Sequence, residues 1–201
     1  LGSGDNVVVD NDIRRNRVGV RLNNLASTGN TVSSNRMEDN RIGVQAYGGA
    51  SDVEIIDNTI LNSIETGMIL DAPRTVVRYD EVLGAARGID IRTTAQLSGV
   101  RIEQVERGVT VASTGIARLE EVEINASLQA LRVDPGGLVT IESSTLYPAP
   151  SGLASAESND TWLPLIGVGA VLVAVTLELV RWRRERRDLP SPIPAEVWNR
   201  A

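Results

Sequence analysis

Four polar residues spaced by multiples of about one repeat are the best candidates in this sequence for binding a ligand: Arg21, Gln45, Asp90 and Arg132. Arginine suits an acidic partner because its planar guanidinium can donate two parallel hydrogen bonds to one carboxylate. The same mixture of polar side chains is typical of any solvated sheet face. The sequence therefore leaves two interpretations open, a binding row for an acidic glycan or plain surface.

Catalytic and metal-binding chemistry has few candidates. The chain contains no histidine and no cysteine, which removes the commonest general base and the thiolate ligands of metals. Acidic residues cluster in three places, the largest cluster being Glu120, Glu121 and Glu123, but neighbours on a strand point to opposite faces. The sequence predicts no catalytic residue, no metal site and no cofactor.

A second row consists of Asn11, Asn35 and Asn58. Such a row could bind a sugar. Asparagines at equivalent turns of a stacked repeat also tolerate left-handed backbone conformations and hydrogen-bond one another. We expect this second role, a structural ladder.

These side chains must be positioned by a repeat, whose clearest copies are Asn16-Arg17-Val18-Gly19-Val20 and Asn40-Arg41-Ile42-Gly43-Val44. Weaker copies contain Gly67, Gly88, Gly108 and finally Ala130, and the successive anchors are 24, 24, 21, 20 and 22 residues apart. A period of this length indicates a solenoid of stacked units. We expect the glycines where the chain turns with positive φ or packs closely.

The side-chain period within each copy is two, as in Val18-x-Val20-x-Leu22 and Ile42-x-Val44-x-Ala46, which is typical of a strand. A second series is expected in Val53-x-Ile55, Val77-x-Tyr79, Val100-x-Ile102 and Val139-x-Ile141. The predicted fold is all-β, a right-handed parallel β-helix over residues 1–146. Its 6 or 7 coils, at about 4.8 Å each, would form a rod roughly 30 Å long.

The strings Asp57-Asn58-Thr59-Ile60 and Asn40-Arg41-Ile42-Gly43-Val44 resemble the coils of the right-handed parallel β-helix repeat family, in the pectate-lyase-like superfamily. The resemblance implies the fold but not one activity, because these rods host lyases, hydrolases, epimerases, adhesins and maturation factors. The catalytic motifs of such enzymes are not matched. Asp134-Pro135-Gly136-Gly137, for example, shares only its first two residues with the Asp-Pro-His-Asp motif of the epimerases.

The C-terminal quarter is of a different kind. Residues 147–161, rich in Pro, Ser, Ala and Gly, predict a flexible stalk. Residues 162–182 form an apolar run with one early tryptophan, one late tryptophan and a following cluster of arginines. This pattern predicts a single transmembrane α-helix with the N-terminus outside and the C-terminus inside the plasma membrane, followed by a short basic cytoplasmic tail, residues 183–201.

The formal net charge of −6 argues against nucleic acid as a partner, because phosphate backbones are bound by basic surfaces. We expect a membrane-anchored extracytoplasmic domain that binds or scaffolds an envelope or secreted polysaccharide. One alternative is a polysaccharide lyase or C5-epimerase whose active site lies in coils upstream of Leu1. Another is an assembly partner for other membrane proteins, packing through Gly167, Gly169 and Glu178.

Overall fold

The computed structural model describes residues 4–23, 28–47 and 49–148, and all regular structure in these residues is β-strand. Strands of successive coils pair in parallel, so that each strand bonds to its equivalents about 22 residues earlier and later. This confirms the all-β parallel solenoid, of about six turns.

Two sheets form the walls. The seven-stranded sheet contains, in spatial order, β1 (Val7–Val9), β4 (Thr31–Ser33), β7 (Glu54–Ile56), β9 (Thr75–Arg78), β11 (Thr94–Ser98), β13 (Ile116–Glu120) and β15 (Leu138–Glu142). The second sheet contains β2 (Asp12–Arg14), β5 (Arg36–Glu38), β8 (Thr59–Leu70), β10 (Glu81–Ile91), β12 (Arg101–Val111), β14 (Glu123–Val133) and β16 (Thr145–Tyr147), together with β3 (Val18–Asn23) and β6 (Ile42–Tyr47).

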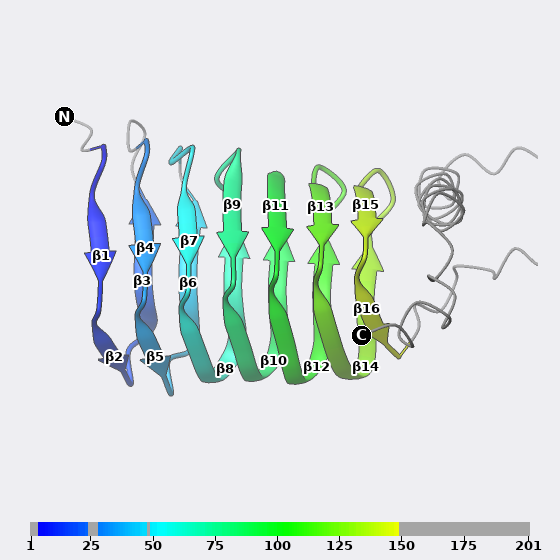
Figure 1. Ribbon diagram of the computed structural model, residues 1–201, viewed down its shortest axis with the longest axis horizontal. Helices are drawn as coiled ribbons and strands as arrows, with labels where there is room; N and C mark the ends of the chain where they lie inside the picture. The colour runs from blue at the N-terminus through cyan, green and yellow to red at the C-terminus, as the bar shows by residue number, and fades with distance from the viewer. Residues whose placement is uncertain (1–3, 24–27, 48, 149–201) are drawn as a thin grey trace, which may run out of the picture.

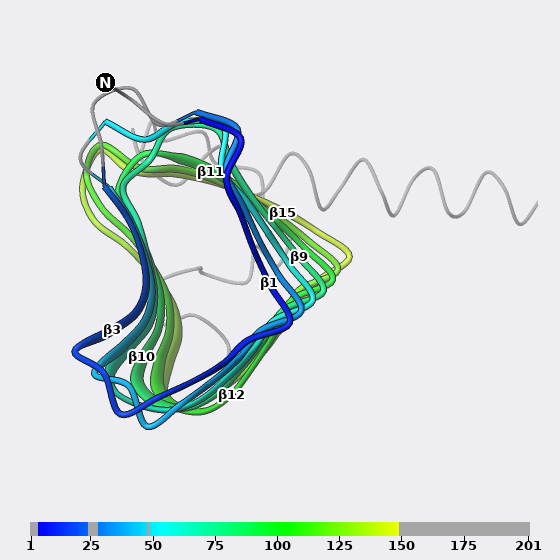
Figure 2. The ribbon, with the colours of Figure 1, turned by 90° about the vertical axis from the view of Figure 1, so that its left-hand side faces the viewer.

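The coils stack like rungs along the rod (Figure 1). Viewed along the axis, the seven-stranded sheet makes a straight wall, whereas the wall formed by β3 and the second half of β10 curves inward (Figure 2). The outer surface of this second wall is therefore concave, and we call it the concave face. It consists of β3 and β6 and the second halves of β8, β10, β12 and β14.

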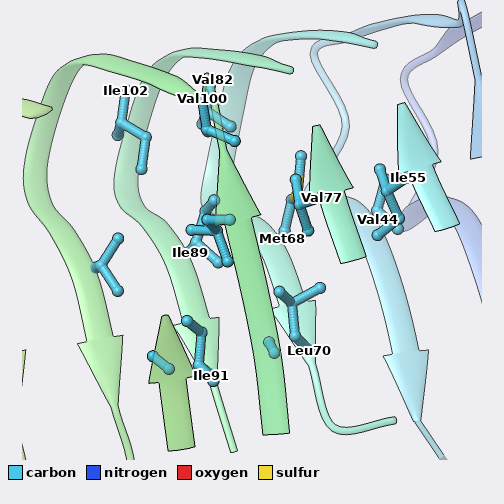
Figure 3. Packing of buried hydrophobic residues seen from close by; sticks show 14 of the residues in the cluster. Val44, Ile55, Met68, Leu70, Val77, Val82, Ile89, Ile91, Val100 and Ile102 are labelled. Carbon is cyan, nitrogen blue, oxygen red and sulfur yellow. The ribbon is translucent and has the colours of Figure 1, made fainter. Parts of the chain in front are cut away.

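Aliphatic side chains fill the interior in rows that run along the rod. Val44, Met68 and Ile89 occupy one row of the concave wall, and all three are fully buried. Ile55 and Val77 face them from the seven-stranded sheet (Figure 3). Burial of one face of every strand fixes the register, because a slip of one residue would turn the whole apolar set toward water.

The second predicted series does not form one row, because Val77 pairs in register with Ile55 and Ile102 belongs to β12 of the second sheet. Two of its errors, at Tyr79 and Val100, have the same cause. Tyr79 has a positive φ of 57° and is 62% exposed, so it lies at a turn and not in the row of Val77. Val100 lies at the next turn, in the position of Asp80, and it is not equivalent to Val53 or Val77. Both errors arise because a single left-handed residue follows each strand of this sheet, Tyr79 after β9 and Gly99 after β11. Such a residue interrupts the alternation of inward and outward side chains.

The aligned glycines of successive coils are required by close packing between the coils. None of Gly19, Gly43, Gly67, Gly88 and Gly108 has a positive φ. A Cβ placed on Gly67 would lie 2.7 Å from the carbonyl oxygen of Gly88, and one on Gly43 would lie 2.6 Å from that of Gly67. Real Cβ atoms do not approach so closely, so successive coils can nest here only without side chains.

The asparagine row forms a hydrogen-bonded ladder. Asn11 donates from its backbone N and its Nδ2 to Oδ1 of Asn35, each at 3.0 Å, and Asn35 donates in the same way to Asn58. We expected the asparagines to adopt the left-handed conformation. Instead, the positive φ belongs to the residue before each of them, for example Asp10 and Asp57.

Asp80 ends this ladder. Its Oδ1 accepts from the backbone N and from Nδ2 of Asn58, both at 2.8 Å. Its Oδ2 is buried and has no hydrogen-bond partner within the described residues. In Asn58 the equivalent position holds Nδ2, which donates to the carbonyl oxygens of Val32 and Ile56. The carboxyl of Asp80 thus occupies a place built for a donor.

The last strand, β16, ends at Tyr147, one residue past the predicted boundary at Leu146. The predicted transmembrane helix and cytoplasmic tail, and the stalk from residue 149 onward, lie outside the described residues. In the portion that the structure does describe, no helix has the length and apolar character needed to cross a bilayer.

Candidate functional site

The four predicted ligand-binding residues lie in one row on the concave face. Arg21 pairs in register with Gln45, and the row continues through Ile69, Asp90 and Thr110 to Arg132. Aligning the repeats of the sequence therefore placed these four residues correctly in one row on the outer side of the wall. Their role in binding stays a prediction.

The two ends of this row differ in what they contact. The Arg21 guanidinium lies over the ring of Tyr47, 4.9 Å from its centroid, and donates to the Tyr47 hydroxyl. At the other end Asp90 is only 8% exposed and accepts from Arg92 at 2.8 Å, while Arg132 donates to Asp134 at 2.9 Å. The second end lies in a hollow.

One hollow of the second sheet, which we call the arginine hollow, has a volume of about 330 Å³. Asp90, Arg92, Thr110 and Arg132 line it, and Arg87, Arg107, Ala112 and Asp134 complete it. Four guanidinium groups face two carboxylates, so the hollow carries a net charge of +2 in a chain whose formal charge is −6. A local positive site of this kind attracts anionic ligands.

The second hollow, the corner hollow, has a volume of about 680 Å³. It forms where β10 has almost no side chains, at Gly84, Ala85 and Ala86, between larger residues of β8 and β12. Gly84 adopts a φ of +72°, and a Cβ there would lie 2.9 Å from Oδ1 of Asn62. The exposed polar side chains of the lining are Asn62, Gln104, Glu106, Asn125 and Ser127, whereas the Ser63 hydroxyl is buried and has no hydrogen-bond partner within the described residues.

The two hollows are joined through the chain. Ala86 and Glu106 line the corner hollow, and the next residues, Arg87 and Arg107, line the arginine hollow. Together they extend over the consecutive strands β8, β10, β12 and β14. The two hollows are therefore neighbours on these strands, although they share no lining residue.

Sequence reasoning missed Arg87, Arg92, Arg107 and Asp134. The signal for two of them was present in the repeat alignment, since Arg87 and Arg107 each stand directly before an aligned glycine in successive coils. The hollow itself could not be found in this way, because it depends on the inward curve of the wall and on the small side chain of Ala112.

The fold and this face define a parallel β-helix whose stacked coils present a polar lateral surface. The model of the NosD family, described as periplasmic copper-binding protein, matches residues 1–119, and the chain belongs to this family. The match includes Arg87, Asp90, Arg92 and Arg107 but ends before β14. No curated protein and no solved structure matches the chain.

Copper does not fit the donors that these residues offer. Copper sites are built from imidazole, thiolate and thioether groups, and the 201 residues contain no histidine or cysteine. Met37 and Met68, the only methionines, are fully buried in the core. Among the described residues no group of three or more acidic side chains is placed to hold a metal ion.

Proposed function

We propose that this chain presents a binding surface for an envelope or secreted polysaccharide in the periplasm. The observation that carries the proposal is a pair of neighbouring hollows, the arginine hollow on the concave face and the corner hollow beside it, lined by amide, hydroxyl, carboxylate and guanidinium groups. The periplasmic setting is supported by the description of the family. Copper has no part in the proposal, for the reason given above.

The dimensions suit an extended chain of sugars. Parallel strands stand about 4.8 Å apart, which is close to the advance of one sugar unit along an extended polysaccharide. The corner hollow crosses β8, β10, β12 and β14, so three or four sugar units could each contact one coil. Asparagine, glutamine and serine side chains both donate and accept hydrogen bonds, as sugar hydroxyls require.

The rigid position of the lining favours binding. Asn62 and Gln104 belong to β8 and β12, which are paired on both sides, so little backbone conformational entropy is lost when a ligand binds. Both hollows are open to solvent, which suits a ligand that lies along the surface of the rod.

Filling the corner hollow is expected to remove binding. Ala86→Leu places a branched side chain at the centre of the hollow, whereas Ser98→Leu makes a similar change on the outer face of the seven-stranded sheet. By titration calorimetry of the full chain against neutral and acidic polysaccharides at low salt, we expect Ala86→Leu to weaken binding about tenfold or more. Ser98→Leu should bind as the unmodified chain does.

Two outcomes would overturn the proposal. One is the failure of the unmodified chain to bind any neutral or acidic polysaccharide of the panel at low salt. The other is equal binding by both leucine variants, which would place the bound sugar elsewhere on the rod. Circular dichroism of both variants checks that the coils remain folded.

We also propose that residues 162–182 tether the binding surface to the plasma membrane. Their apolar run of about 21 residues is long enough to cross roughly 30 Å of hydrocarbon, and the arginines that follow favour a cytoplasmic C-terminus. The full chain is expected to stay in the membrane fraction after alkaline carbonate washing, and a chain ending at residue 161 to be released. Release of both would remove the anchor from the proposal.

A further inference from the structure

Arg87 and Arg107 are an unusual pair in this molecule. Nine of the fourteen arginines in the described residues form an ion pair within 4.0 Å, and Arg21 contacts Tyr47. Of the remaining arginines, only Arg87 and Arg107 are neighbours in register, on β10 and β12. Two unpaired guanidinium groups therefore lie side by side.

The surrounding acids are already engaged. Asp90 accepts from Arg92 at 2.8 Å, and Asp134 accepts from Arg132 at 2.9 Å. Glu65 feels the charge of Arg87, but the pKa of its carboxyl is lowered mainly by Arg41, whose guanidinium lies 2.7 Å away. Within 4.0 Å no carboxylate of the described residues forms an ion pair with Arg87 or Arg107, and Glu106, the residue before Arg107, belongs to the lining of the corner hollow.

The residues in register with this pair on the neighbouring strands β8 and β14 are uncharged. Thr66 precedes Arg87, and Gln129 follows Arg107. Like charges directly opposite each other on neighbouring strands are destabilising. The charge repulsion between these two arginines does not stabilise the fold, and their arrangement matches what an oxyanion needs, since each guanidinium offers a planar pair of donors.

We infer that Arg87 and Arg107 together hold one oxyanion group of the polysaccharide, a uronate carboxylate or a sugar sulfate. The arginine hollow receives this group while neighbouring sugar units lie in the corner hollow, which begins one residue away at Ala86 and Glu106. The inference rests on the proposed function and names its ligand class, a polysaccharide with acidic units.

The test compares Arg87→Gln/Arg107→Gln with Arg78→Gln in the full chain. Arg78 also lacks an ion pair within the described residues, but it lies on β9 in the other sheet. The probes are a uronate oligosaccharide, a sulfated oligosaccharide and a neutral oligosaccharide of the same length. We expect the double variant to lose about tenfold or more in affinity for the acidic probes, with no change for the neutral one. Arg78→Gln should bind all three as before.

Thermal unfolding separates a binding role from a structural one. Without ligand, the double variant is expected to melt at the same temperature as the unmodified chain or higher, because the repulsion is gone. A clear fall in its melting temperature would mean that the arginines support the fold, and would overturn the inference. Unchanged affinity of the double variant for the acidic probes would also overturn it, while leaving the corner hollow and the proposed function intact.

Inorganic sulfate distinguishes the two proposals from each other. If the arginine pair is an oxyanion site, sulfate raises the melting temperature of the unmodified chain more than that of the double variant. Such a difference, together with no binding of any oligosaccharide, would keep the oxyanion site but end the proposal of a polysaccharide ligand. Equal effects of sulfate on both chains would count against the site itself.

Discussion

Asp80→Asn is expected to raise the free energy of unfolding at pH 8 by up to about 4 kcal/mol. Burial raises the pKa of the Asp80 carboxyl from 3.8 to about 7; hydrogen bonds from Asn58 oppose this shift, and the charge of Asp57 adds to it. The variant places an amide Nδ2 at the buried Oδ2 position. It would donate there to backbone carbonyls as Nδ2 of Asn58 does, and so lengthen the ladder.

The pH dependence of stability follows from the same shift. Between about pH 4 and pH 7 the folded chain keeps a proton on Asp80 that the unfolded chain has released. The protonated Asp80 carboxyl therefore makes its full contribution to the free energy of unfolding below pH 4. This contribution falls as the pH rises through the window and is lost above pH 7. Asp80→Asn should remove this fall.

Urea unfolding at several pH values between 4 and 8 measures the effect. Asp10→Asn is a matched control, because Asp10 lies at an exposed turn with a φ of 56°, a conformation that asparagine tolerates. We expect it to change the free energy of unfolding by no more than about 0.5 kcal/mol. If Asp80→Asn is less stable than the unmodified chain at pH 8, the Asp80 carboxylate must have a stabilising partner, and the prediction is wrong.

Val44→Asp is expected to lower the free energy of unfolding by about 4 kcal/mol or more. Val44 is fully buried between Val20 and Met68 in the core row, where a carboxylate finds neither water nor a basic partner. Since natural domains are stable by only about 5–15 kcal/mol, a large share of the chain would unfold. Circular dichroism with urea titration measures this loss.

Gln45→Asp is the control at the next residue, which faces outward in the row of Arg21. The same carboxylate is solvated there, and the change should stay within about 0.5 kcal/mol. If both aspartates are tolerated equally well, the assignment of inward and outward faces on β6 is wrong.

The inner rows of the concave wall could be predicted from the sequence because they depend on local information. Alternation with a period of two and a glycine before each strand suffice to align Val44 with Met68 and Ile89. The seven-stranded sheet could not be aligned as well, since one left-handed residue such as Tyr79 ends each of its strands. Coils of 20 to 24 residues also differ in the length of the loops that lead into this sheet, such as residues 71–74 and 92–93, without a strong signal in the sequence.

The candidate site was predictable only as a line of residues. The repeat gave the row of Arg21, Gln45, Asp90 and Arg132, and the register confirms that they align. Which part of the row is hollowed depends on the curvature of the wall and on small residues, such as Gly84 and Ala112, that belong to other rows. Those features arise from packing of whole coils, and no short pattern encodes them.

Binding of acidic polysaccharide by Arg87 and Arg107 on the concave face is tested by arginine-selective modification of the full chain. Phenylglyoxal reacts with accessible, unpaired guanidinium groups, and peptide mass spectrometry reports each site. A saturating uronate oligosaccharide is predicted to protect Arg87 and Arg107 while Arg78, on the other sheet, stays reactive. Equal modification of Arg87 and Arg107 with and without the oligosaccharide would contradict the account.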